Sequence, residues 1–169
     1  MEKEKKRVLV AGSYDPVTKG HMMLIEYAAA HYEEVFVVMF VNAEKEYLFT
    51  VEERRALLEA ACKGYTNVTV DYWEGMQYQY AEKMGIDLVI RGYRGEADLE
   101  YEHRVADFNR KALPGFETLL LPSGENERQI TSTAIRQMLG QKRDVSPYVP
   151  GETLDLLADF AEKKKWKKM

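Results

Sequence analysis

The chain has 169 residues, a length that fits one domain with a sizeable core. Hydrophobic residues make up 46% and charged residues 31%, a balance typical of soluble globular proteins, and the net charge of −4 argues against nucleic acid as a partner. The first apolar run, Val8–Ala11, is too short for a signal sequence or a membrane span. We therefore expect residues 1–169 to form a single cytoplasmic domain that has no membrane partner.

Five short runs have the apolar and β-branched composition of strands. They are Val8–Gly12, Val35–Asn42, Val68–Trp73, Ile86–Gly92 and Phe116–Ser123. Several are almost continuously apolar, which is typical of parallel strands that are buried on both faces.

Helical patterns lie between these strands and after the last one. The expected helices are His21–Tyr32, one that begins at Thr50, Met76–Met84, Asp98–Leu113, Thr131–Leu139 and 152–165, the last followed by a basic tail to residue 169 that we interpret as solvated. Thr50 and Glu53 have capping-box spacing, and Cys62, the single cysteine, is interpreted as a packed small residue of the same helix. Strand and helix alternate, which predicts a Rossmann-like, doubly wound α/β fold: a five-stranded parallel sheet with helices on both faces.

The loop after the first strand, GSYDPVTKGH, is the first candidate site, because ligands of such sheets bind at the carboxyl ends of the strands. Ser13 offers a hydroxyl, and His21 stands at the start of a helix, whose free N–H groups suit a phosphate. A helix-capping or packing role explains His21 equally well. The spacing matches neither GxGxxG nor GxxxxGK[ST], which excludes the usual dinucleotide and P-loop motifs.

The loops after the second and fourth strands add cations. Lys45 is either a point charge for a phosphate or a solvated lysine. Arg91 and Arg94 repel each other unless an anion lies between them, and they suit bidentate phosphate contacts. Carboxylates of the same segment could supply that anion internally; they are Glu96, Asp98, Glu100 and Glu102.

The loop after the fifth strand ends in three hydroxyl residues, Thr131, Ser132 and Thr133, which open a helix. One hydroxyl is expected to cap the helix, and the remaining N–H and O–H groups could hold a polyphosphate. Arg136 lies one turn further along. A single polyanion site explains all four loops more simply than four independent structural roles.

Two of these stretches together resemble the motifs of the nucleotidylyltransferase superfamily. TKGH is similar to its T/HxGH motif, and ITSTAIR is similar to its ISSTxIR motif, in the same order along the chain. Within the superfamily the chain most resembles the bacterial phosphopantetheine adenylyltransferases, on the stretches GSYDPVTKGH, LFTVEER, IRGYRGEADLEYE and ITST. That family transfers the adenylyl group of ATP to 4′-phosphopantetheine, giving dephospho-coenzyme A and pyrophosphate in coenzyme A biosynthesis, and it requires Mg²⁺.

The resemblance implies a role for each matching residue. His21, Lys45 and Arg94 would be catalytic, with His21 on the α-phosphate and Lys45 on the acceptor phosphate. The ATP-binding set would be Ser13, Tyr14, His21, Gly92, Tyr93, Arg94, Glu102, Glu127, Arg128, Gln129, Ile130, Thr131, Ser132 and Thr133, and the acceptor-binding set would be Ser13, Lys45, Gln77 and Arg91. No Cys/His cluster is present in the sequence, so Mg²⁺ is expected to be held mainly by ATP phosphates rather than by protein ligands. The family forms hexamers, which implies a homo-oligomer.

Three stretches depart from the family pattern and keep alternatives open. GMQYQYA stands where the family has an apolar stretch, ERQITST lacks the family's aromatic residues, and the opening VLVAGSYDP is unusual. Gln77 and Tyr78 make the acceptor arm more polar. One alternative is a related nucleotidylyltransferase with another phosphorylated acceptor, such as nicotinamide mononucleotide or glycerol 3-phosphate. The other is a non-catalytic nucleotide-binding protein of the same fold.

Overall fold

A computed structural model describes residues 2–123 and 131–166 of the chain. Its elements, in chain order, are β1 (Glu4–Gly12), α1 (Lys19–His31), β2 (Tyr32–Val41), α2 (Val51–Cys62), β3 (Val68–Glu74), α3 (Gln77–Met84), β4 (Leu88–Tyr93), α4 (Glu96–Ala112), β5 (Glu117–Pro122), α5 (Ser132–Gly140), the 3₁₀ helix η2 (Gly151–Thr153) and α6 (Leu154–Glu162). Strands and helices alternate from β1 to α5, as the sequence predicts.

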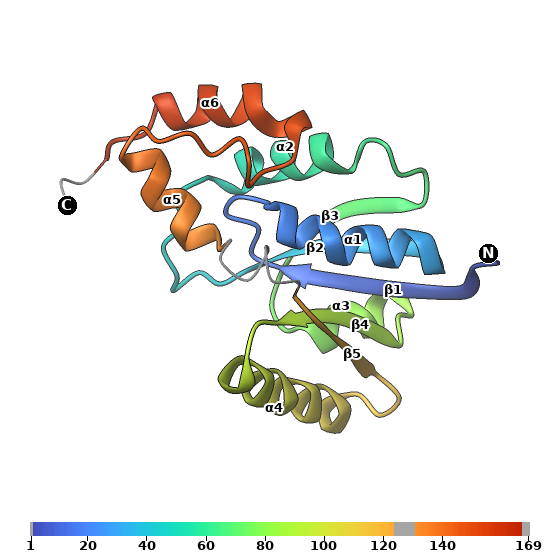
Figure 1. Ribbon diagram of the computed structural model, residues 1–169. Coiled ribbons are helices and arrows are strands. Elements are labelled where there is room, and N and C mark those ends of the chain that lie inside the picture. Colours follow the sequence, from blue (N-terminus) through green and yellow to red (C-terminus); the bar gives the residue numbers. More distant parts are fainter. Residues whose placement is uncertain (1, 124–130, 167–169) are drawn as a thin grey trace.

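The five strands form one parallel sheet in the order β3-β2-β1-β4-β5. Helices cover both of its faces: α1, α2, α5 and α6 pack on one face and α3 and α4 on the other (Figure 1). The chain therefore has the predicted Rossmann-like, doubly wound α/β fold. Strand order reverses between β1 and β4, and in such sheets ligands bind outside that point of reversal.

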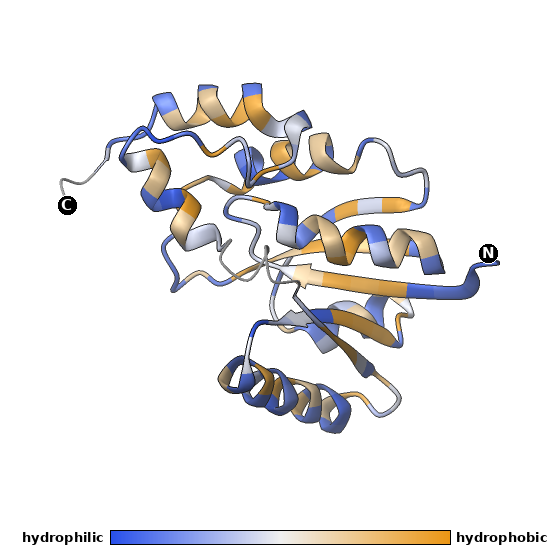
Figure 2. Cartoon of the chain, viewed as in Figure 1, coloured by the Kyte–Doolittle hydropathy of each residue, from blue (hydrophilic) through white to orange (hydrophobic). Residues whose placement is uncertain are grey.

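The middle strand β1 explains why its sequence is continuously apolar. Val8 and Val10 join the core beneath α1 and α2, while Leu9 and Ala11 join the core on the opposite face, beside α3. All four side chains are buried because adjacent residues of a strand point to opposite faces and both faces are covered. Figure 2 shows the apolar sheet enclosed between helices whose outward residues are hydrophilic.

Several element boundaries differ from those expected. β1 begins at Glu4 rather than Val8, because Glu4 pairs with Tyr32 of β2 although its side chain is exposed. The expected final helix over 152–165 is instead the 3₁₀ turn η2 followed by α6. The Pro150 carbonyl accepts hydrogen bonds from both the backbone N–H and the hydroxyl of Thr153, which closes this tighter turn. Hydrogen bonding, rather than apolar periodicity, decides both boundaries.

Residues 163–166, which follow α6, are better packed than expected for a solvated tail, and residues 167–169 lie outside the described residues. Lys164 pairs with Glu53 of α2 and lies over the Phe49 ring, and the Trp166 ring packs against Gly140 at the end of α5. No helix within residues 2–123 and 131–166 is long and apolar enough to cross a membrane.

Local expectations for α2 are confirmed. Thr50 and Glu53 form a reciprocal capping box, with each side chain accepting the other's backbone N–H. Cys62 is buried in the core, and burial raises the pKa of its thiol to about 12. A thiol in that state is not a nucleophile at neutral pH.

Candidate active site

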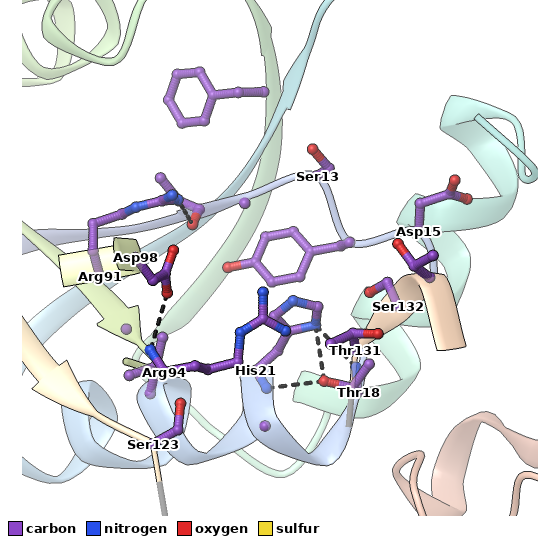
Figure 3. A pocket seen from close by; sticks show the side chains of 18 of the residues that line it. Ser13, Asp15, Thr18, His21, Arg91, Arg94, Asp98, Ser123, Thr131 and Ser132 are labelled. Carbon is purple, nitrogen blue, oxygen red and sulfur yellow. Dashed lines mark hydrogen bonds between the residues drawn. The ribbon is translucent and has the colours of Figure 1, made fainter. Parts of the chain in front are cut away.

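A cavity of about 510 Å³ opens at the carboxyl ends of β1 and β4, where strand order reverses. Its wall is built from the loops after β1, β2 and β4 and from the first turns of α1, α4 and α5. Described residues from all four loops singled out in the sequence therefore line one site, with Ser123 and Thr131–Thr133 representing the loop after β5 (Figure 3).

The loop after β1 is held to the loop after β2 by Asp15. This carboxylate is 3% exposed and accepts the backbone N–H groups of Leu48 and Phe49, each at 2.9 Å. Arg54 adds a second tie, because its guanidinium donates to the Ser13 carbonyl at 3.0 Å and to the Phe49 carbonyl at 3.1 Å. Two buried charged groups thus fix the shape of this part of the wall.

The first turn of α5 is attached to the same loop. Ser132 donates its hydroxyl hydrogen to the Pro16 carbonyl at 2.9 Å, and Arg136 donates to the Asp15 carbonyl at 2.7 Å. Thr131 caps the helix by accepting the N–H of Ala134 at 2.9 Å, as one hydroxyl was expected to do. The helix N-terminus therefore faces the cavity with its other hydroxyls close to the loop after β1.

His21 is both a capping residue and a cavity residue. Its Nδ1 accepts the backbone N–H of Thr18 at 3.0 Å. The backbone N–H of His21 in turn donates to the Thr18 hydroxyl at 3.2 Å. Since Nδ1 is an acceptor, the neutral ring carries its proton on Nε2. Burial, followed by the charges of Arg91 and Arg94, lowers the pKa of His21 to about 4, so the ring is neutral at pH 7.

Tyr14 supports the His21 ring. The two rings meet edge to face, with centroids 4.8 Å apart, and the Tyr14 hydroxyl donates to the Val10 carbonyl at 3.0 Å. Gly12 makes room for this arrangement, because a Cβ there would lie 3.1 Å from the Tyr14 ring. The Tyr14 side chain, which was expected at the ATP, is only 2% exposed, although it does line the cavity.

The two arginines after β4 have different surroundings. Arg91 forms a two-pronged ion pair with buried Glu102, at 2.8 and 3.1 Å, and donates to the Ala11 carbonyl at 2.8 Å. Burial opposes the charge of Arg91, but Glu102 outweighs it and raises the pKa. Arg94 donates its backbone N–H to Asp98, and its guanidinium has no hydrogen bond or ion pair within the described residues. Figure 3 shows the Arg94 side chain extending toward His21.

Most of the predicted site residues line the cavity. They are Ser13, Tyr14, His21, Lys45, Gln77, Arg91, Gly92, Arg94, Glu102, Thr131, Ser132 and Thr133. Tyr93 does not line it. Glu127, Arg128, Gln129 and Ile130 lie outside the described residues.

Some residues of the site escape sequence reasoning. Asp15 belongs to the quoted loop but shows no pattern of its own, and Arg54 resembles any charged residue of a helix. Asn109 of α4 is buried and donates at 3.3 Å to the side chain of Gln77 in α3, far from it in the sequence. Their partners are brought close only by the fold, so no local signal marks them.

Comparison with known proteins places this chain in a family. The Cytidylyltransferase-like family model matches residues 9–138. The phosphopantetheine adenylyltransferase of Staphylococcus carnosus is 36% identical over 85% of this chain and 89% of its own length. The chain belongs to the phosphopantetheine adenylyltransferase family. The enzyme of that name from Shouchella clausii is 34% identical, over 86% of this chain and 91% of its own length.

The fold of this family member also matches a solved structure. The nicotinic acid mononucleotide adenylyltransferase of Plasmodium falciparum, complexed with NaAD, superposes with a TM-score of 0.64 at 14% identity. The match covers 93% of this chain and 96% of the other. At this identity the likeness shows the shared fold alone.

Proposed function

We propose that this enzyme transfers the adenylyl group of ATP to 4′-phosphopantetheine, giving dephospho-coenzyme A and pyrophosphate, a step of coenzyme A biosynthesis. The observation that carries the proposal is the convergence of His21, Lys45, Arg94 and the α5 N-terminus on one cavity. It is supported by the 36% identity to a phosphopantetheine adenylyltransferase over most of the chain.

The reaction needs no nucleophile from the protein. An oxygen of the acceptor phosphate attacks the α-phosphorus of ATP, and the bond from that phosphorus to the pyrophosphate oxygen breaks. The attacking phosphate is already ionised at neutral pH, so no strong base is required. The protein contributes orientation and positive groups at the positions where negative charge increases.

His21 is the group best placed to act on the α-phosphate. Its Nδ1 is engaged by the Thr18 N–H, so Nε2–H remains to donate to a phosphate oxygen. The neutral ring enters the reaction as a hydrogen-bond donor. As negative charge develops on the phosphate, the hydrogen bond from Nε2–H to its oxygen becomes stronger.

The cations divide between the two substrates. Arg94 has a guanidinium unengaged by any described residue, and with Arg136 and the N–H groups of α5 it would hold the ATP polyphosphate. Lys45, which also lines the cavity, would hold the acceptor phosphate. Arg91 keeps N–H groups beyond those used by Glu102 and Ala11, and with Gln77 it would contact the acceptor.

Mg²⁺ would enter with ATP. Three of the four carboxylates that line the cavity are already engaged: Asp15 by two backbone N–H groups, Asp98 by the Arg94 N–H and Glu102 by Arg91. The fourth, Glu46, is exposed. The described residues contain no group of three His, Cys, Asp or Glu side chains placed to hold a metal ion. This site fits an ion held mainly by phosphate oxygens and water, whose charge offsets that of the polyphosphate.

A homo-oligomer is part of the proposal, and the resemblance implies a hexamer. Four large apolar side chains support it because they are exposed on the described surface; they are Tyr72, Met76, Tyr101 and Phe108. Sedimentation velocity at micromolar protein would give the number of subunits, and a monomer would contradict this part of the proposal.

Pyrophosphate release from ATP and Mg²⁺ tests the reaction and its acceptor together. The panel holds 4′-phosphopantetheine, nicotinamide mononucleotide, glycerol 3-phosphate and no acceptor. Release with 4′-phosphopantetheine alone is expected. Release with another acceptor would keep adenylyl transfer and change the substrate, and the polar Gln77–Asn109 pair would then be the first place to look. ATP binding without release would favour a non-catalytic role.

A further inference from the structure

Lys45 lies on a part of the wall that has little packing of its own. Residues 42–46 are all exposed, although the loop borders the cavity. The Lys45 ammonium has no hydrogen bond or ion pair within the described residues. A lysine on such a loop samples many rotamers, and fixing one of them for a substrate costs conformational entropy. Something in the structure has to offset that cost.

Tyr47 closes the loop that carries Lys45. Its hydroxyl accepts the backbone N–H of Asn42 at 3.0 Å, which joins the two ends of the exposed run. Inside this closure the Lys45 N–H donates to the Asn42 carbonyl, and the Glu44 N–H donates to the Asn42 side chain, each at 3.0 Å. The Lys45 ammonium lies over the Tyr47 ring, 5.5 Å from its centroid.

The Tyr47 ring itself rests on a rigid cation. The Arg54 guanidinium lies 4.0 Å from the ring centroid, within the range of cation–π contacts. Arg54 is 1% exposed and is anchored through the Ser13 and Phe49 carbonyls. The ring therefore connects an exposed lysine to a buried arginine that also shapes the loop after β1.

A second cavity explains why the lysine needs this support. About 350 Å³ in volume, it is lined by Tyr47, Arg54 and neighbouring residues of the loop, and Lys45 borders both it and the active-site cavity. Removing the tyrosine ring would enlarge the second cavity and give the lysine side chain a place to turn away from the substrate.

We propose that Tyr47 is a positioning residue, whose ring holds the Lys45 ammonium at the rim of the active-site cavity. This inference rests on the proposed role of Lys45 at the acceptor phosphate. It assigns no contact between Tyr47 and substrate; the tyrosine acts through Lys45. The ring is the active part, and the hydroxyl serves the loop closure.

A double-mutant cycle tests the proposal. Tyr47→Ala is expected to lower kcat/KM for 4′-phosphopantetheine about 3- to 30-fold, the range of a cation–π contact, and to raise KM for the acceptor more than KM for ATP. Tyr47→Phe keeps the ring and is expected to retain most of the activity. In a Lys45→Ala background, Tyr47→Ala is expected to cause no further loss. Equal losses with and without Lys45 would overturn the proposal.

Hydrogen exchange of residues 42–50 gives a readout that does not depend on activity. Tyr47→Ala is expected to speed exchange of this segment, and Lys63→Ala, which changes an exposed residue after α2 outside both cavities, is expected to leave it unchanged. Tyr47→Leu keeps apolar volume without the ring and replaces Tyr47→Ala if that variant fails to fold. Absence of turnover in the wild-type protein would overturn the proposed function; exchange would then decide the positioning role, with unchanged exchange overturning it.

Discussion

The side chain of His21 uses its two nitrogen atoms for different purposes. Nδ1 belongs to the capping box of α1, where it accepts the Thr18 N–H, and Nε2 is left for the cavity. The capping interpretation of this residue is therefore confirmed, and the phosphate interpretation stays a prediction that the free Nε2 allows. The cap sets the tautomer and the orientation of the ring, which are the properties that a hydrogen-bond donor to a phosphate needs.

Replacing His21 tests its proposed part in the reaction. His21→Ala is expected to reduce kcat by about two to three orders of magnitude, the effect typical of losing one hydrogen bond that is strongest in the transition state. The fold should persist because Thr18 still caps α1. Pyrophosphate release measures the loss, circular dichroism checks the fold, and His103→Ala, an exposed histidine on α4, is the control. Near-normal turnover in His21→Ala would exclude the role.

The low pKa of His21 also predicts a dependence of stability on pH. The imidazole has a pKa of about 4 in the folded chain and 6.5 as its ordinary value, so between these pH values the unfolded chain binds more protons. Stability from this group is complete above pH 6.5 and is lost as pH falls toward 4. The melting temperature of the wild type should fall more steeply over that window than that of His21→Gln. Parallel curves would show that His21 does not titrate in this way.

Single residues also mark the limit of sequence reasoning about the site. Lys45, Arg91 and Arg94 stand out because they lie at or near the ends of apolar strands, and His21 stands out at the start of the helix after β1; the cavity collects all four. Whether a charge is free or paired depends on residues far along the chain. The guanidinium of Arg91 pairs with Glu102, whereas that of Arg94 pairs with no described carboxylate. The sequence places four carboxylates near both arginines and so does not indicate which arginine is paired.

Among the elements, the loops after β1 and β2 behave as one unit because Asp15 joins them. Asp15→Asn would turn one of its two acceptor atoms into a donor facing a backbone N–H, and it would remove the charge beside Arg136. We expect a loss of about 2–4 kcal/mol in the free energy of unfolding, the scale of breaking buried hydrogen bonds to a charged group.

Urea denaturation measures this change, with Asp159→Asn as an exposed control on α6. The same variant should weaken acceptor binding, since Lys45 belongs to the loop that Asp15 holds. A stability equal to that of the wild type would mean that the Asp15 hydrogen bonds contribute nothing net.

The elements themselves follow from the sequence better than their ends do. The continuous apolar runs predict where the strands lie, because strands buried on both faces, such as β1 and β2, need apolar residues at successive positions. The ends depend on hydrogen bonds that carry no periodic signal. Glu4 extends β1 through pairing with Tyr32, and Thr153 closes a 3₁₀ turn where a longer helix was expected.

For the whole molecule, binding of Mg²⁺ and ATP should appear as added stability. A ligand at 100 times its Kd stabilises the folded chain by about 2.7 kcal/mol, which corresponds to a rise in Tm of about 5–10 °C for a chain of this size. Arg94→Ala should reduce the rise because it removes the guanidinium that no described residue engages. Arg143→Ala, an exposed arginine outside the cavity, should not. Differential scanning calorimetry makes the comparison, and an equal rise in all three proteins would remove Arg94 from the ATP site.

The ladder between β1 and β4 divides the molecule along the line of its active site. It contains three residue pairs, Val8–Leu88 to Val10–Ile90, whereas the other three ladders contain six or seven. Beyond Ile90 the strands part, and a side chain, Arg91, bridges them by reaching the Ala11 carbonyl. The sheet thus has two parts, β3-β2-β1 and β4-β5, which are joined by the short ladder between β1 and β4. A substrate that contacts both parts adds contacts across this ladder. When the unliganded protein is pulled mechanically, we expect β1 and β4 to separate first.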